Sequence, residues 1–292
     1  MALVKMNENN NIKGVLIPIG GNEDKGDRWG TKLDFKKNGI LSHVLQEGKG
    51  KESKVVVIPT ASRIPEEVGQ NYIDAFAKLG CRNVTVLNIK RREQASSKES
   101  IMHISTADCV MFSGGNQSRI RGKIADTEVH RILLERFTKE PLVVAGTSAG
   151  AMAMATEMIS GGSSSDALLK GAVKMRKGLS LIPKLIIDTH FVRRGRFGRL
   201  AEALAMHPHL IGIGLAEDTG LIIKNCNEFR VIGSGMVIVM DPSNLTHNRY
   251  QELKVGTPMS MSNLITHFLA NGDKFRLDER EIEVLPLSEV FS

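Results

Sequence analysis

Short continuous runs of apolar, mostly β-branched residues recur along the first two thirds of this chain, with stretches of helical spacing between them. Runs of this kind are typical of strands buried on both faces, as in a parallel sheet. The runs are residues 14–19, 54–59, 83–88, 109–112, 141–145 and 185–188. Helical spacing covers 65–79, which ends at Gly80, and about 126–139. Right-handed βαβ crossovers then predict an α/β fold with a doubly wound, mostly parallel sheet.

The character of the chain changes after residue 210. Residues 211–216, 220–223 and 230–240 resemble strands separated by short turns, and we expect them to be antiparallel strands closing one edge of the sheet. Residues 258–270 return to helical spacing, and 277–290 suggest a final strand or an extended tail. We therefore expect a flexible N-terminal segment over residues 1–13 and a single α/β domain, which holds any active site, over residues 14–292.

Composition and charge indicate where the protein acts and which partners it binds. The first thirteen residues are polar and Asn-rich, and no apolar run approaches the ~18 residues of a membrane span, so we expect a soluble, cytoplasmic protein without membrane contact. The net charge of +7 is compatible with binding to nucleic acid or to an acidic polymer. However, only 4% of residues are aromatic, and the sequence has no Cys/His zinc-finger pattern. We expect no nucleic-acid partner.

Cysteines and histidines give no sign of a metal. Cys81, Cys109 and Cys226 are far apart and show no Cys-x-x-Cys spacing, so we interpret them as reduced and mostly buried. No pair of histidines has convincing metal-ligand spacing. The sequence therefore predicts no metal site.

The most informative segment is Gly146-Thr-Ser148-Ala-Gly150, which follows an apolar strand and precedes a helix. This is the Gly-x-Ser-x-Gly nucleophile elbow in the strand-turn-helix context that the motif needs. The turn forces a strained backbone on the serine, so its neighbours must be small, and the helix start supplies free N–H groups beside the hydroxyl. A packing turn, or one that holds a phosphate, is the structural alternative.

Two further strand ends offer partners for Ser148. His190 ends the run 185–190, and Glu217 ends the run 211–217. A serine hydroxyl needs a base to remove its proton, and that base needs a carboxylate to orient it, so the order Ser, His, Glu fits a catalytic triad. Alternatively, the histidine satisfies a backbone carbonyl and the glutamate is a solvated charge.

These residues, together with other motifs in the same order, resemble the cyanophycinases of the serine peptidase S51 type. The further motifs are Gly20-Gly-Asn-Glu-Asp-Lys25, Gly114-Gly-Asn-Gln117, Asp188-Thr-His-Phe191 with three arginines, and Glu217-Asp218. The resemblance spans about residues 14 to 240. It implies a flavodoxin-like, class I glutamine-amidotransferase-like fold, a homodimer without metal or organic cofactor, and release of β-aspartyl-arginine dipeptides from cyanophycin, a poly-aspartate chain bearing arginine through isopeptide bonds.

Carried over to this chain, the resemblance implies Ser148 as nucleophile, His190 as base and Glu217 as orienting acid. Substrate would be contacted by Gln117, Asp188, Thr189, Arg194, Arg196 and Arg199. A guanidinium suits the carboxylates of an aspartyl backbone, and Asp188 would pair with a substrate guanidinium, whereas an ordinary charged helix start is the structural alternative. We expect the amides of Gly115 and Ala149 to bind the oxyanion.

One departure concerns Thr189, because the family commonly has Gln at that position. A shorter side chain removes an amide that would bind substrate, so a modified cyanophycin or a short aspartyl peptide is an alternative substrate. An aspartyl dipeptidase similar to peptidase E is the alternative enzyme, and a non-catalytic binding protein of the same fold is the alternative outside enzymes.

Overall fold

The computed structural model describes residues 12–27, 33–162, 164 and 166–286. The N-terminal segment predicted over residues 1–13 lies outside the described residues, apart from its last two. The helices are α1 (Phe35–Asn38), α2 (Ile40–Glu47), α3 (Pro65–Lys78), α4 (Lys98–Thr106), α5 (Gln117–Ile124), α6 (Glu128–Lys139), α7 (Ala149–Ala153) and α8 (Phe197–Met206), with 3-10 turns η1 (Gly50–Glu52) and η2 (Arg92–Ser96).

The strands form a nine-stranded, a four-stranded and a two-stranded sheet. They are β1 (Val15–Ile19), β2 (Val55–Ile58), β3 (Val84–Val86), β4 (Cys109–Phe112), β5 (Val143–Thr147), β6 (Glu157–Gly161), β7 (Lys174–Lys177), β8 (Leu185–Asp188), β9 (Ile211–Leu215), β10 (Thr219–Lys224), β11 (Glu228–Gly233), β12 (Val237–Asp241), β13 (Ile265–Leu269), β14 (Lys274–Arg276) and β15 (Glu281–Glu283).

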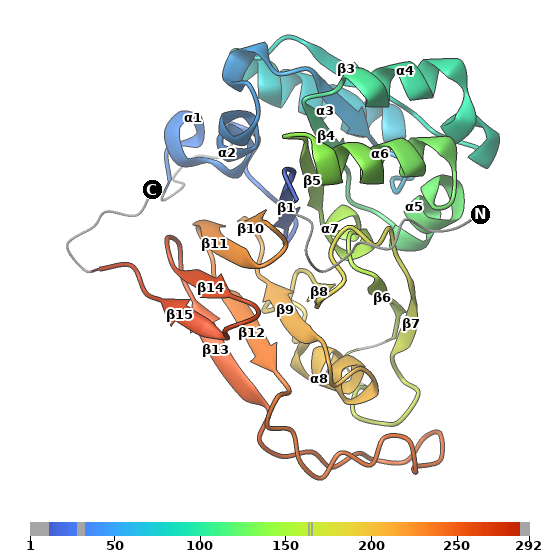
Figure 1. Ribbon diagram of the computed structural model, residues 1–292, viewed down its shortest axis with the longest axis vertical. Helices are drawn as coiled ribbons and strands as arrows, with labels where there is room; N and C mark the ends of the chain where they lie inside the picture. The colour runs from blue at the N-terminus through green and yellow to red at the C-terminus, as the bar shows by residue number, and fades with distance from the viewer. Residues whose placement is uncertain (1–11, 28–32, 163, 165, 287–292) are drawn as a thin grey trace.

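The large sheet has the order β15-β14-β11-β10-β1-β5-β4-β2-β3. Strands β1, β5, β4, β2 and β3 are parallel, and β10, which pairs antiparallel with β1, begins the antiparallel edge. The predicted α/β class with a mostly parallel sheet and antiparallel edge strands is confirmed. In Figure 1 the helices α1–α6 surround the parallel strands in the upper half of the molecule.

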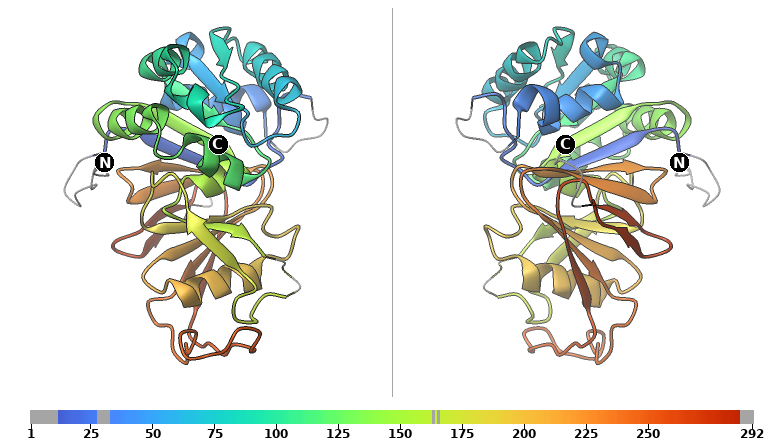
Figure 2. Two further views of the ribbon diagram at one scale, coloured as in Figure 1. Left: turned by 90° about the vertical axis from the view of Figure 1, so that its right-hand side faces the viewer. Right: turned by 90° about the vertical axis from the view of Figure 1, so that its left-hand side faces the viewer.

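Alternate side chains of the parallel strands enter two hydrophobic cores. Val55 and Val57 of β2 pack with α2 and α3 on one face, whereas Val56 and Ile58 pack with α4 to α7 on the other. Because both faces are covered, both sets of side chains are apolar, which explains the continuous apolar runs in the sequence. The views in Figure 2 show the helical layers on the two sides of this sheet.

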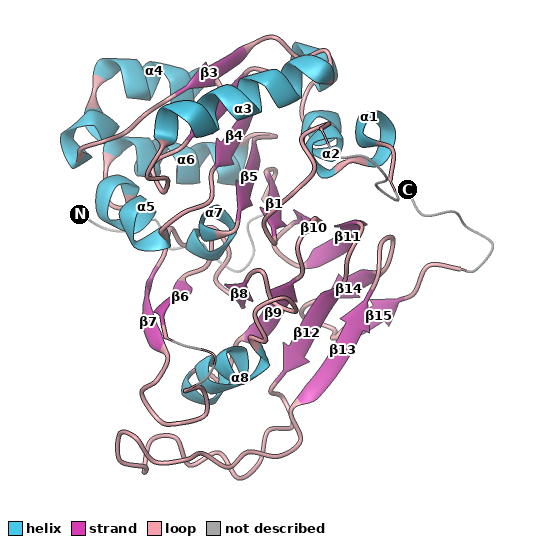
Figure 3. Cartoon of the chain, turned by 180° about the vertical axis from the view of Figure 1, so that it is seen from behind, coloured by secondary structure: helices cyan, strands magenta, loops and turns pink. Residues whose placement is uncertain are grey.

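The four-stranded sheet has the order β13-β12-β9-β8. In Figure 3 it lies, together with α8, below the parallel strands of the large sheet. Strands β8 and β9 are parallel to each other, and β12 and β13 are antiparallel. The runs 185–188 and 211–216 were expected in the main sheet and instead build this second one. Gly233, with a φ of 95°, lets the run 230–240 turn from β11 in the first sheet into β12 in the second.

Residues 258–270 do not form the expected helix. Ile265–Leu269 is the strand β13, which pairs antiparallel with β12. Strand β12 is buried along its whole length, so the backbone groups on its edge need hydrogen-bond partners, and pairing with that edge outweighs the helical spacing of the local sequence. Of the tail predicted over 277–290, Glu281–Glu283 is strand β15, and residues from 287 on lie outside the described part.

Candidate active site

Ser148 lies between β5 and α7 in a strained backbone conformation. Its φ of 51° and ψ of −108° place a residue with a side chain in a region that costs about 1–3 kcal/mol and is found at functional sites. The flanking glycines are sterically required: a Cβ on Gly146 would lie 2.7 Å from the carbonyl carbon of Gly150, and one on Gly150 would lie 2.5 Å from the oxygen of Phe112. The sequence therefore folds locally as the elbow motif predicts.

The structure brings Ser148, His190 and Glu217 together from the ends of three strands. Ser148 Oγ is 2.9 Å from His190 Nε2, and His190 Nδ1 is 2.7 Å from Glu217 Oε1. The two contacts use opposite nitrogens of the imidazole, so the ring can accept the serine proton while it donates to the carboxylate. The arrangement is that of a nucleophile, a base and an orienting acid.

The glycine pair after β1 holds these segments in place. The amides of Ser148, His190 and Asp218 donate to the carbonyls of Ile19, Gly20 and Gly21, each over 2.9 Å. A Cβ on Gly20 would lie 1.8 Å from the oxygen of Ala216, and one on Gly21 would lie 2.4 Å from His190 Cε1. The close approach of these backbones therefore requires glycine at both positions.

Charges around the site set the proton affinities of the base and the acid. Burial and the nearby charges of Arg194 and Arg196 lower the pKa of His190 below its ordinary value, against the opposing effect of Glu217. Burial raises the pKa of Glu217, but hydrogen bonds from His190, Arg193 and Asn22 outweigh it and bring that pKa to about 2. At neutral pH the imidazole is therefore neutral and the carboxylate ionised, as a general base and its orienting acid need to be.

Two residues that contact Glu217 were not assigned from the sequence. Arg193 donates to both oxygens of Glu217, over 3.1 and 2.9 Å, and Asn22 donates to Oε2 over 3.2 Å. Asn22 is 195 positions from Glu217, so no local spacing indicates this contact. The position of Arg193 beside the proposed base was the one available signal.

Gly115 and Ala149 are the two residues whose amides were expected to bind the oxyanion. Gly115, at a φ of 139°, lines the same pocket as Ser148, and Ala149 is the first residue of α7. Neither N–H donates a hydrogen bond to another residue in the described part of the chain. Both are thus free to bind a developing oxyanion.

Ser148 and His190 line a pocket of about 440 Å³. Loops after β1, β4, β5 and β8 contribute to its wall, together with α3. The lining residues are Gly21, Asn22, Glu23, Lys25, Val68, Asn71, Tyr72, Gly114, Gly115, Thr147, Ser148, His190 and Arg194. Among the expected substrate contacts, Arg194 is the one that reaches this pocket.

The remaining expected substrate contacts are engaged inside the protein. Asp188 is fully buried and accepts from Arg196 Nη1 at 2.9 Å and from Arg199 Nε at 2.7 Å. Its carboxylate therefore neutralises two arginines of this chain and is not free for a substrate guanidinium, contrary to the expectation. Gln117 donates to the carbonyl of Ile159 over 2.8 Å, outside the residues that line the pocket.

Thr189 is also fully buried and does not line the pocket with Ser148. The expectation that its side chain contacts substrate does not fit this position. The difference from the Gln common in the family thus lies behind the site, next to the buried carboxylate of Asp188, whose Oδ1 accepts from the Thr189 amide at 2.8 Å.

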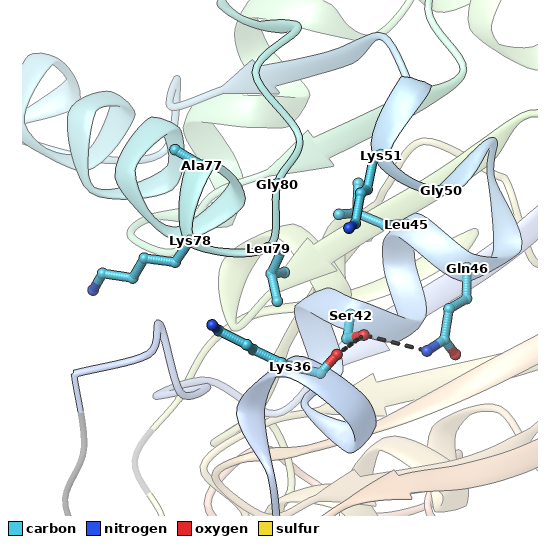
Figure 4. Close-up of a pocket in the computed structure, with 10 residues that line it drawn as sticks. All are labelled: Lys36, Ser42, Leu45, Gln46, Gly50, Lys51, Ala77, Lys78, Leu79 and Gly80. Atoms are coloured by element: carbon cyan, nitrogen blue, oxygen red, sulfur yellow. Dashed lines mark hydrogen bonds between the residues drawn. The ribbon is translucent and has the colours of Figure 1, made fainter.

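A second cavity, of about 470 Å³, lies between α2, η1 and the end of α3 (Figure 4). Its polar side chains are those of Lys36, Ser42, Gln46, Lys51 and Lys78. The hydroxyl of Ser42 donates to the carbonyl of Lys36 over 2.9 Å, and none of the residues that line this cavity is a histidine or a carboxylate. It therefore lacks the histidine and carboxylate partners that Ser148 has.

The described residues contain no group of three or more His, Cys, Asp or Glu side chains arranged to hold a metal ion. Across the same part of the chain, no helix has the length and apolarity needed to cross a membrane. Cys81, Cys109 and Cys226 are free thiols in buried positions, as their spacing predicted.

Comparison with known proteins agrees with the motifs. The sequence model of peptidase family S51 matches residues 31–231. A cyanophycinase of Trichormus variabilis is 36% identical over 270 residues, which cover 92% of this chain and 88% of the relative. A cyanophycinase of Geminocystis herdmanii is 32% identical over 264 residues, covering 90% of this chain and 94% of the relative.

Among solved structures, the chain is similar to a peptidase from an acI-B1 Actinobacterium. The TM-score is 0.61 and the sequence identity 20%, over 88% of this chain and 98% of the other. At this identity the likeness concerns the fold, and it agrees with the arrangement of strands and helices described above.

Proposed function

Because the chain belongs to peptidase family S51 and is a serine-type peptidase, we propose that it hydrolyses cyanophycin and releases β-aspartyl-arginine dipeptides. The observation that supports this most directly is the chain of contacts from Ser148 Oγ to His190 Nε2 and from His190 Nδ1 to Glu217, in a pocket open to substrate. The similarity to two cyanophycinases over nine tenths of the chain supports the substrate.

In this proposal Ser148 Oγ attacks the aspartyl peptide carbonyl while His190 Nε2 accepts the hydroxyl proton. Glu217 accepts the Nδ1–H bond, which fixes the tautomer of His190 and stabilises the imidazolium that forms. The carbonyl oxygen becomes negatively charged and is bound by the amides of Gly115 and Ala149.

The tetrahedral species then collapses. His190 gives its proton to the leaving amine, the C–N bond breaks, and an acyl ester remains on Ser148. Water attacks the ester with His190 again as base, and the proton returns to Ser148 Oγ when the product acid leaves. Removing one oxyanion donor in an enzyme of this type slows turnover by about 10²–10³-fold, so the Gly115 and Ala149 amides account for a large part of the rate.

We further propose that residues 14–292 act as one catalytic domain and that the enzyme is a cytoplasmic homodimer. The family resemblance supports the dimer. Phe268, 63% exposed on the outer strand β13, leaves apolar surface open on the four-stranded sheet. Sedimentation equilibrium across a range of protein concentrations measures the assembly directly, and a monomer at all concentrations contradicts the homodimer.

The direct test incubates purified protein with insoluble cyanophycin and identifies soluble products by mass spectrometry. We expect β-aspartyl-arginine from the wild type and none from Ser148→Ala. A parallel incubation with free α- and β-aspartyl dipeptides separates a polymer-degrading enzyme from a dipeptidase. Cleavage of the dipeptides without release from the polymer contradicts the proposed substrate, and no cleavage of either contradicts the proposed activity.

A further inference from the structure

Lys25 stands out among the residues that line the Ser148 pocket, because a buried network holds its ammonium group there. Lys25 Nζ donates to Glu23 Oε1 over 2.8 Å and lies 5.0 Å from the centre of the Tyr72 ring. The side chain of Glu23 is 1% exposed, whereas that of Lys25 is 27% exposed. The lysine is thus fixed at one side and open to the pocket at the other.

Glu23 links Lys25 to the nucleophile turn. Its Oε1 also accepts from the Tyr72 hydroxyl at 2.5 Å, and its Oε2 accepts from Thr147 Oγ1 at 2.6 Å. Thr147 directly precedes Ser148. The carboxylate of Glu23 therefore positions the lysine relative to the turn that carries the nucleophile, with hydrogen bonds to both of its oxygens.

The pocket has excess positive charge. Glu23 is the one acidic residue among the described lining residues, and three donors already bind its two oxygens. Arg194 is the other cation, and its guanidinium forms no hydrogen bond or ion pair within the described residues. A lysine ammonium has three N–H donors, and a single one of Lys25 is used in that part of the chain, so two remain for a ligand.

We propose that Lys25 and Arg194 form a carboxylate-binding site that selects the substrate unit presented to Ser148, with Glu23 as the residue that positions Lys25. This rests on the proposed function, because each repeating unit of the proposed substrate carries a free carboxylate on its arginine. The aspartate chain as a whole has one more free carboxylate, at its end. Charge-assisted hydrogen bonds from an ammonium or a guanidinium to a carboxylate are roughly twice as strong as those between neutral groups.

A synthetic dimer of two β-aspartyl-arginine units tests the proposal in three forms. The first is the free acid, the second has a carboxamide at the end of the aspartate chain, and the third has carboxamides on the arginines. We expect the wild type to cleave the free acid with a kcat/KM about 10- to 100-fold above that of at least one amide, and the amide that fails identifies which carboxylate is bound.

Lys25→Met keeps the length of the side chain and removes its charge, and we expect it to lose most of this preference. Lys139→Met is the matched control, because Lys139 is an exposed lysine on α6, paired with Glu135 outside the pocket. Loss of the lysine leaves the buried Glu23 charge uncompensated, so Arg194→Gln serves as a second variant, at an exposed position where folding is not at stake.

The outcomes separate this inference from the proposed function. If the wild type cleaves all three dimers equally, or if Lys25→Met and Arg194→Gln keep the full preference for the free acid, the carboxylate site is refuted and the peptidase activity stands. If the wild type releases nothing from cyanophycin or from any dimer, the proposed function fails, and this inference fails with it.

Discussion

Gly21 packs against the imidazole of His190, and its replacement by alanine tests how the proposed base is held. The added Cβ would lie 2.4 Å from His190 Cε1 and 2.6 Å from Nε2. Non-bonded carbon atoms approach to about 3.5 Å, so the ring must retreat by about 1 Å. The same change places a side chain at a φ of 102°, a backbone conformation that favours glycine.

Both effects have a predictable size. Displacing a catalytic group by about 1 Å reduces the rate by about 100-fold, because Nε2 of His190 leaves the 2.9 Å contact with Ser148 Oγ. The backbone strain lowers the free energy of unfolding by about 1–3 kcal/mol. We therefore expect Gly21→Ala to fold, with a lower Tm and a much lower kcat/KM.

The assay measures kcat/KM for release of β-aspartyl-arginine and, independently of substrate, the rate at which Ser148 is labelled by a fluorophosphonate. Gly256→Ala is the control. Gly256 also has a positive φ, of 84°, but apart from its two chain neighbours no described residue has an atom within 4 Å of its would-be Cβ. It should lower the Tm in the same way and leave both rates unchanged.

The two variants distinguish the effect of contact with His190 from the effect of backbone strain. If Gly21→Ala keeps the kcat/KM of the wild type, the ring is not held against the glycine. If Gly256→Ala loses as much activity as Gly21→Ala, the loss reflects stability and not the position of the base. Either result contradicts the role of Gly21 in positioning His190.

Three further predictions follow from the charges around the site. In the proposed mechanism the neutral form of His190 acts as base, and burial and nearby arginines hold the pKa of His190 below the ordinary 6.5. We therefore expect kcat/KM to fall with decreasing pH only below that value, and Arg194→Gln to move this limb to higher pH in a pH–rate profile. Asp188→Asn leaves two largely buried arginines without their carboxylate, so we expect the free energy of unfolding, measured by urea titration, to fall by about 3–5 kcal/mol. Glu135→Gln, which breaks an exposed ion pair, should leave this free energy nearly unchanged. Equal effects of the two substitutions contradict the structural role of Asp188. Glu217→Gln should reduce kcat by about 10⁴-fold, because the carboxylate that fixes the tautomer of the proposed base is lost. Circular dichroism should show an intact fold. Retained turnover excludes Glu217 as the orienting acid.

Much of the fold follows from local sequence patterns. The apolar runs at 55–58 and 109–112 are strands because both faces of the parallel sheet are covered, and such strands need apolar residues at every position. The helix predicted over 258–270 was wrong because a contact between distant segments, and not the local pattern, decided the structure there. Its apolar spacing suits a helix, but the edge of β12 required a partner, and a pairing between segments that far apart leaves no mark on local periodicity.

The sequence likewise predicted some features of the candidate site and missed others. Ser148 was predicted from the elbow motif, and His190 and Glu217 because each ends an apolar run and ends of strands meet at one edge of a sheet. Asp188 and Arg199 were recognised as important residue types but were expected to face substrate. Their ion pair, with Arg199 Nη2 at 2.5 Å from Asp188 Oδ1, is a property of how β8 and α8 pack.

By itself, the sequence determined the elbow at Ser148, the order of the three candidate catalytic residues and the alternation of strand and helix, because these depend on residue type and on spacing within a few positions. The tertiary structure decided that β8 and β9 form a second sheet, that Asp188 is neutralised inside the protein, and that Lys25 and Arg194 share a pocket with Ser148. Whether a charged side chain meets solvent, substrate or another charge depends on groups brought from distant parts of the chain, and local sequence does not encode that choice.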